Sequence, residues 1–273
     1  MSDEHEGAVG PELTAAFPYS PTLPVLFVGH GSPMNAIEDN EDSRAWLQVG
    51  ARLPTPRAIL CISAHWETDG PRVTAMPQPR TIYDFYGFPP ALYKAEYPAP
   101  GSPLLARLVQ SLLPGVTPDD AWGLDHGAWS VLLRLFPQAT IPVVQLSLDT
   151  RRTPQQHYQF AAMLRPLRRR GVLIVASGNI VHNLRMICWE DQRYPWAVAF
   201  DAQVRDLIQN REHGPLIDYP SLSEFAPLAI PTNEHYLPLL YALALQEPDD
   251  AVRFFADRVT NCSLSMRSLQ LGR

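Results

Sequence analysis

The stretch LPVLFVGHGSP, residues 23–33, decides the fold, because an apolar run ends in it directly at a histidine between two glycines. Two further stretches have the same form, RAILCISAHW at residues 57–66 and VLIVASGNIVHN at residues 172–183. Short, near-continuous runs of Val, Ile and Leu are typical of parallel strands that are covered on both faces. Ligands bind beyond the carboxyl ends of such strands, so the pattern predicts that these three histidines lie together.

The rest of the chain alternates strand-like runs with helical patterns, which predicts an α/β fold. We expect a single domain with a mostly parallel sheet, helices on both faces and a metal site at the strand C-terminal ends. The predicted strands are Leu23–Val28, Arg57–Ile62, Val143–Leu148 and Val172–Ala176. The predicted helices are Asp42–Val49, Pro103–Leu113, Ala128–Phe136, Pro154–Arg170, Tyr194–Asn210 and Pro231–Gln246.

The two ends of the chain differ from this pattern. Residues 1–20 are polar and acidic, without the apolar core of a signal peptide, and we expect a poorly ordered tail there. We expect residues 21–273 to form one domain. Apolar and polar residues alternate strictly over residues 263–269, which predicts a half-exposed edge strand.

Composition excludes several classes of partner. The net charge is −6, and the one basic run, Arg168–Arg170, fits cations at the end of a helix, so nucleic acid is not expected to bind. No apolar run approaches ~18 residues, so no membrane span is expected. Cys61, Cys188 and Cys262 are widely spaced without a CxxC pair. They indicate a buried core thiol at Cys61, no disulfide framework, and a reducing cytoplasm.

Histidine is the commonest metal ligand among side chains, so the clustered histidines favour a mononuclear metal site. His30 lies between two glycines, and His65 and His182 each follow a predicted strand. A fourth candidate, His235, opens the last predicted helix within PTNEHYLP. The remaining His5, His157 and His213 are expected to be structural, with His213 at a helix C-terminus.

Another histidine, His126, precedes a helix in WGLDHGAW, residues 122–129. It is either a helix-start residue or an acid or base whose ring is oriented by Asp125. The segment Pro71–Pro103 is rich in proline and in tyrosine and phenylalanine. It is either a rigid surface connection or a stiff aromatic cover over the strand ends.

Six blocks in order along the chain carry a resemblance to a known family. They are GHGSPM (29–34), SAHW (63–66), YPAPG (97–101), DHG (125–127), ASGNIVHN (176–183) and PTNEHYLP (231–238). They resemble the DODA-type extradiol aromatic ring-opening dioxygenases, and most closely the bacterial 4,5-DOPA dioxygenase extradiol group. The resemblance implies a single α/β domain that opens a small catechol such as DOPA with O₂, beside the two hydroxyl groups. It also implies one divalent ion per chain, Fe²⁺ or Zn²⁺, held at His30, His65, His182 and His235.

The resemblance leaves some roles open. A glutamate is the third ligand in the wider superfamily, but His235 occupies the matching motif position in this subgroup, so His235 is favoured and Glu234 is the alternative. His182 either binds the ion or acts as a base, and His126 is expected to serve the chemistry. Four nitrogens would suit Zn²⁺, whereas three with His182 free would suit Fe²⁺. The alternatives are a zinc hydrolase that uses a metal-bound water and a binding protein without turnover. The oligomeric state is left open.

Overall fold

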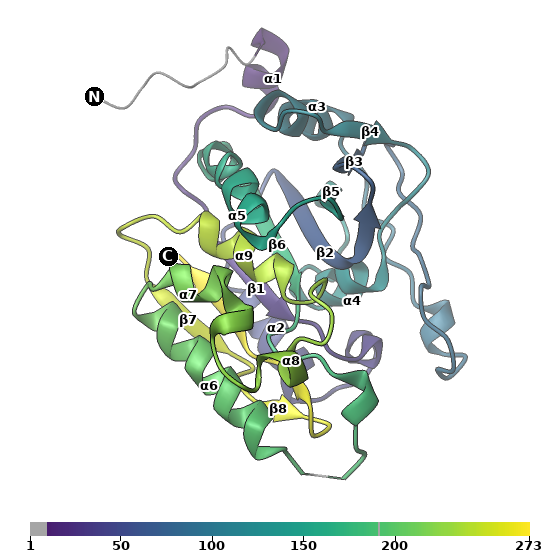
Figure 1. The fold of residues 1–273 in the computed structure, drawn as a ribbon. Helices are drawn as coiled ribbons and strands as arrows, with labels where there is room; N and C mark the ends of the chain where they lie inside the picture. The colour runs from purple at the N-terminus through teal and green to yellow at the C-terminus, as the bar shows by residue number, and fades with distance from the viewer. Residues whose placement is uncertain (1–9, 191) are drawn as a thin grey trace.

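The computed structural model describes residues 10–190 and 192–273, which form an eight-stranded sheet between helices (Figure 1). The strand order is β4-β3-β5-β2-β6-β1-β10-β7, and β8 and β9 pair separately. The strands are β1 Val25–Gly29, β2 Ala58–Thr68, β3 Arg72–Thr74, β4 Thr117–Asp119, β5 Val143–Asp149, β6 Val172–Gly178, β7 Val252–Phe255, β8 Val259–Thr260, β9 Leu264–Ser265 and β10 Ser268–Leu271.

The four central strands, β5, β2, β6 and β1, are the four predicted from the sequence, and they run parallel. The apolar side chains of β1 alternate between two cores, with Val25 and Phe27 on one face and Leu26 and Val28 on the other. Burial of both faces explains why these segments read as unbroken apolar runs. The outer strands β10, β7 and β3 are antiparallel to their inner neighbours, so the sheet is mixed but mostly parallel.

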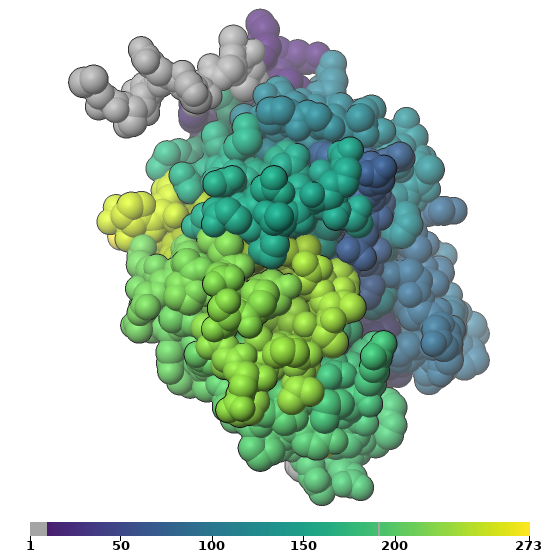
Figure 2. Space-filling view, in the orientation of Figure 1, coloured from purple at the N-terminus to yellow at the C-terminus, as the bar shows by residue number. Residues whose placement is uncertain are grey.

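Helices cover both faces of the sheet, as predicted. Trp46 and Trp129 pack one core from α2 and α4, and the helices α3, α5, α6 and α9 pack the other (Figure 1). In Figure 2 the C-terminal half, coloured green to yellow, covers the lower front of the molecule. None of the described helices combines the length and apolar character that a membrane crossing requires. The helices are α1 Pro11–Ala16, α2 Glu41–Gly50, α3 Pro103–Leu112, α4 His126–Leu135, α5 Pro154–Ala162, α6 Pro195–Gln209, α7 His213–Ile217, α8 Ala226–Ala229 and α9 Leu237–Ala244, with the 3₁₀ turns η1 Pro33–Ala36, η2 Leu92–Lys94, η3 Arg165–Arg169, η4 Leu184–Met186 and η5 Tyr219–Ser221.

The predicted helix Pro154–Arg170 is shorter than expected, because α5 ends at Ala162 and the chain continues into η3. Pro166 explains the break, since proline has no N–H to donate and disfavours helical geometry in the residue before it. The basic run that follows is also not simply a solvated helix end. Arg168 is buried and forms an ion pair with Asp250 at 2.6 Å.

The prediction of a half-exposed edge strand at residues 263–269 was wrong. The segment is buried, and β10 lies between β1 and β7. Its serines are polar without facing solvent, because Ser268 accepts the backbone N–H of Gly29 and Ser265 donates to Asp201. The alternation of polar and apolar residues in this segment therefore does not indicate one face in solvent, because both kinds of side chain are buried.

At the N-terminus, residues 1–9 of the expected tail lie outside the described residues. Within the described part, α1 precedes Phe17, which is buried in the core. Arg107 of α3 pairs with Glu12 of α1 at 2.8 Å. The packed part of the chain thus begins before residue 21.

The sequence indicated no disulfide framework, but the structure contains a disulfide between Cys188 and Cys262. The two residues are 74 positions apart in sequence, but their Cα atoms are 5.5 Å apart in the fold. The wide separation of the two cysteines in sequence does not reveal that they are close in space. They come together because the β8–β9 pair packs against the segment after His182. Cys61 is a free, buried thiol as predicted.

We expect the disulfide to stabilise the fold. A crosslink that closes a loop of this size contributes about 2–4 kcal/mol, chiefly by restricting the unfolded chain. The double variant Cys188→Ala/Cys262→Ala should lower the free energy of unfolding in urea by that amount. It should still bind metal, because Asn183 and Ser263 hold the same two segments by hydrogen bonds. Equal midpoints for the variant and the oxidised protein would contradict the expectation.

Candidate metal centre

His30 directly follows β1, and its hydrogen bonds determine which ring nitrogen is free. Its backbone N–H donates to Gly178 O, the last residue of β6. The Ser177 hydroxyl donates to Gly127 O at 2.6 Å and lies 3.0 Å from His30 Nδ1. Because the serine proton is already used, the serine oxygen accepts the proton of His30 Nδ1. The unprotonated Nε2 of His30 is therefore available as a metal ligand.

His65 lies within β2, where the pairing with β5 shifts register between Ile62 and Glu67. Its Nε2 atom is 3.1 Å from Nε2 of His30. Gly127 allows this placement, since a Cβ there would lie 2.8 Å from the His65 ring. Two neutral ring nitrogens at such a separation need a shared proton or a cation, and they fit a divalent ion as histidine ligands usually do.

His235 reaches the same place from the segment before α9. Its carbonyl accepts the N–H of Asn179, and a Cβ at Gly178 would lie only 2.1 Å from that carbonyl oxygen. Glycine at the end of β6 thus lets the two backbones touch. Glu234 Oε1 lies 2.9 Å from His235 Nδ1, which directs Nε2 of His235 away from the carboxylate.

His235 was expected to open a helix. The structure corrects this, because α9 begins at Leu237, and the His235 ring contacts the Glu234 carboxylate. The arrangement is the familiar one in which a carboxylate orients a metal-binding imidazole.

His182 stacks face to face on His235, with ring centroids 3.4 Å apart and planes 8° from parallel. The lone pair of an imidazole nitrogen lies in the ring plane. One ion cannot lie in both of these parallel planes, so in this arrangement only one of the two rings can bind an ion along its lone pair. His235 is nearer the other histidines, with centroids 5.2 Å from His30 and 4.9 Å from His65.

His126 is the first residue of α4 and joins the cluster. Its ligand atom lies within 4.8 Å of those of His30 and His65, and its ring centroid is 3.8 Å from that of His65. The predicted partner of its ring, Asp125, was wrong. Asp125 caps α4 through the N–H of Ala128 and accepts hydrogen bonds from Ser63 and Gln145.

The carboxylate beside His126 is Asp84, which sequence reasoning missed. Asp84 Oδ1 accepts the backbone N–H of His126 at 2.9 Å and lies 3.0 Å from its Nδ1. Asp84 belongs to the proline- and aromatic-rich segment, where no periodic pattern singles it out. The one feature of the sequence that could have indicated Asp84 is its position as a carboxylate among aromatic residues in IYDFYGFP.

Burial lowers the pKa of four of these histidines, His30, His65, His182 and His235, and keeps them uncharged at neutral pH. Burial lowers the pKa of His65 to about 3 and that of His182 to about 4. Burial, reinforced by the neighbouring histidines, also holds the pKa values of His30 and His235 well below the ordinary value. Neutral imidazoles are the form that binds metal ions and accepts protons.

The aromatic segment packs beside this cluster. Phe85 meets His126 edge to face at 5.5 Å and also contacts Trp129, Phe88 and Tyr93. Of the two interpretations of this segment, these contacts favour an aromatic cover over the histidines and not a rigid surface connection. Trp129 Nε1 donates to Ile82 O and so fixes the segment to α4.

The histidines expected to be structural lie elsewhere. His157 contacts the Tyr241 hydroxyl at 3.0 Å within the core. His213 starts α7 instead of ending a helix, and it contacts Tyr158 and Gln246. His5 lies outside the described residues.

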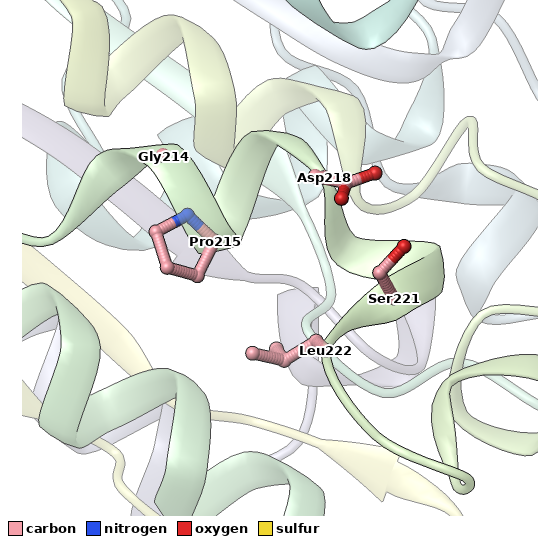
Figure 3. A pocket seen from close by; sticks show the side chains of 5 residues that line it. All are labelled: Gly214, Pro215, Asp218, Ser221 and Leu222. Atoms are coloured by element: carbon pink, nitrogen blue, oxygen red, sulfur yellow. The ribbon is translucent and has the colours of Figure 1, made fainter.

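Two surface cavities share no residue with the histidine cluster. The first has a volume of about 410 Å³ and is lined by Gly214, Pro215, Asp218, Ser221 and Leu222 (Figure 3). The second is lined by residues 20–23, 54–57 and 171, at the amino ends of β1, β2 and β6. The chemistry-bearing residues are therefore gathered at the opposite, carboxyl ends of the strands.

Comparisons with known proteins agree with this geometry. A family model described as the catalytic LigB subunit of aromatic ring-opening dioxygenase matches residues 22–265. A 4,5-DOPA dioxygenase extradiol of Escherichia coli is 48% identical over 261 residues, covering 93% of this chain and 96% of the relative. A 4,5-DOPA dioxygenase extradiol of Beta vulgaris is 42% identical over 80% of this chain and 85% of its own. The crystal structure of an uncharacterized Escherichia coli protein superposes with a TM-score of 0.80 at 43% identity, covering 92% of this chain and all (100%) of that one.

Proposed function

The chain belongs to the LigB family of extradiol aromatic ring-opening dioxygenases, and we propose that it opens a small catechol such as DOPA with O₂ at one divalent metal ion. The observation that carries the proposal is the convergence of His30 and His65, whose Nε2 atoms are 3.1 Å apart, with His235 beside them. Relatives that carry the DOPA dioxygenase name support the choice of substrate.

We assign His30, His65 and His235 as the residues that hold the ion. Each has an oxygen acceptor close to its Nδ1 atom, from Ser177, Asp84 and Glu234 respectively, so each presents Nε2 to the centre. Three ligands leave room for a bidentate substrate and O₂. Iron(II) is the ion proposed for turnover, and zinc would occupy the same nitrogens. A bound iron(II) would supply chelation of the catechol oxygens and the electrons that make O₂ reactive.

His182 and His126 are proposed to move protons. A catechol must lose protons from its hydroxyl groups to chelate, so neutral imidazoles are needed within reach. His182 is neutral at neutral pH, because burial lowers its pKa to about 4, and its stack on His235 keeps its lone pair off the plane of the ligand ring. His126 lies beside Phe85, which covers its ring edge to face and limits access of water to it.

The decisive experiment is anaerobic loading with Fe²⁺, followed by addition of DOPA and air. We expect uptake of one O₂ per catechol and a yellow ring-opened product that contains both oxygen atoms from ¹⁸O₂. A protein that binds iron stoichiometrically but consumes no O₂ with DOPA or simpler catechols would overturn the proposal. Ester or amide hydrolysis by the zinc-loaded protein alone would instead support a metal-activated water.

The assignment of His235 over Glu234 makes a separate prediction. His235→Ala should lose stoichiometric metal, because it removes a nitrogen ligand. Glu234→Gln should keep the ion and weaken its affinity by about 10–100-fold, since it changes only the partner of the His235 ring. Chelator competition with Zn²⁺ measures both. A larger loss in Glu234→Gln than in His235→Ala would make the carboxylate the ligand.

A further inference from the structure

One carboxylate in this site contacts two histidines at once. Asp84 Oδ1 lies 3.0 Å from Nδ1 of His126, and Asp84 Oδ2 lies 3.4 Å from Nδ1 of His65. We propose that Asp84 is a positioning residue that fixes both rings with Nε2 toward the metal centre, and so couples a metal ligand to a proton-transferring histidine. The inference deepens the proposed function and rests on it for the roles of the two histidines.

The contacts give Asp84 little freedom to serve anything else. Its Oδ1 atom also accepts the backbone N–H of His126, which ties the carboxylate to the first residue of α4. The two residues before it anchor the chain. Ile82 pairs through its N–H with Leu124 O, and the Tyr83 hydroxyl donates to Ala95 O. The carboxylate is thus held at a fixed place between the two rings.

The position of the proton on each ring follows from the acceptor that faces it. A carboxylate at neutral pH offers only lone pairs, so the ring nitrogens that face it carry hydrogen. For His65 this leaves Nε2 unprotonated, and that atom is the one 3.1 Å from His30 Nε2. His126 Nδ1 lies 3.0 Å from Asp84 Oδ1, and the two atoms face each other without the alignment of a hydrogen bond.

Asp84 differs from the other two acceptors near the predicted ligands. Ser177 contacts His30, and Glu234 contacts His235 with His182 close by, whereas Asp84 contacts two rings of the group formed by His30, His65 and His126. A change at Asp84 should therefore affect metal binding and proton transfer together. An amide at this position would be nearly the same size, but it would present an acceptor to one ring and a donor to the other. The donor would force the second ring into the wrong tautomer.

The test compares Asp84→Asn with Asp119→Asn. Asp119 is a matched control, because it also accepts backbone N–H groups and faces one cation, Arg72, at 3.0 Å, but it contacts none of these histidines. Zn²⁺ affinity is measured by chelator competition without any catechol. Ring tautomers are read from histidine ¹⁵N shifts. We expect Asp84→Asn to weaken Zn²⁺ binding by about 10–100-fold and to shift one ring from the Nδ1–H form. Asp119→Asn should stay within about threefold of the parent protein.

Iron-loaded turnover adds a second reading, in which Asp84→Asn should lower kcat more than it raises KM. Asp84→Glu guards against a folding defect, since it keeps the charge and should retain more Zn²⁺ affinity than Asp84→Asn. Unchanged Zn²⁺ affinity and unchanged ¹⁵N shifts in a folded Asp84→Asn would overturn the inference, and so would a weaker Asp84→Glu. The Zn²⁺ and ¹⁵N readings stand even if the parent protein opens no catechol, so failure of the function and failure of this inference are distinguishable.

Discussion

Replacing His30 or His65 by Ala should abolish stoichiometric metal binding and ring opening, while the fold persists. Each residue supplies one of the two nitrogens that lie 3.1 Å apart, His30 directly after β1 and His65 within β2. With either nitrogen missing, the remaining ligands are too few to hold the ion against dilution. Metal content, measured by elemental analysis after gel filtration, should fall from about one ion per chain to below about a tenth.

The matched control is His157→Ala. His157 is as deeply buried as His30, at 1% exposure for both, but it contacts Tyr241 in the core, away from the cluster. It should lose stability of about 1–3 kcal/mol, because the Tyr241 hydroxyl loses a buried partner, and yet it should retain full metal content. If His30→Ala and His65→Ala both kept their metal, the centre would have to be built from the other histidines.

The residues of this site that lie in or directly after a strand could be predicted from the sequence. Apolar runs buried on both faces leave a strong signal, and the histidine that follows each run has a defined place at the sheet edge. For this reason His30, His65 and His182 were found together with the four central strands. His235 was also predicted, although the helix assigned to it was too long, because residues 231–236 form bends and a turn before α9 begins at Leu237.

The contacts between residues that are distant in sequence could not be predicted, because they depend on how the segments pack. Asp84 lies 42 positions before His126, in a segment whose prolines and aromatic residues fix a shape without any period. Asp125 was the nearer carboxylate in sequence, but its side chain caps α4 and turns toward Ser63. The Cys188–Cys262 disulfide has the same origin, since its proximity arises only after β9 packs beside His182.

The second large effect is expected at His126. His126→Ala should retain its iron and still bind catechol, but kcat should fall by about 10²–10⁴-fold, which is the usual contribution of a general acid or base. Three contacts favour this role. Asp84 lies beside Nδ1, Phe85 covers the ring edge to face, and the His65 ring lies 3.8 Å away between ring centroids.

The main competitor is a role for His126 as a ligand, because its nitrogen lies within 4.8 Å of those of His30 and His65. Metal analysis separates the two roles before any turnover is measured, since loss of the ion in His126→Ala would make it a ligand. Added imidazole provides a second test of the role. If His126 transfers protons, free imidazole should partly restore the turnover of His126→Ala in a concentration-dependent way, at constant iron content. Turnover equal to that of the parent protein, at full iron loading, would reduce His126 to the first residue of α4 with no part in the chemistry.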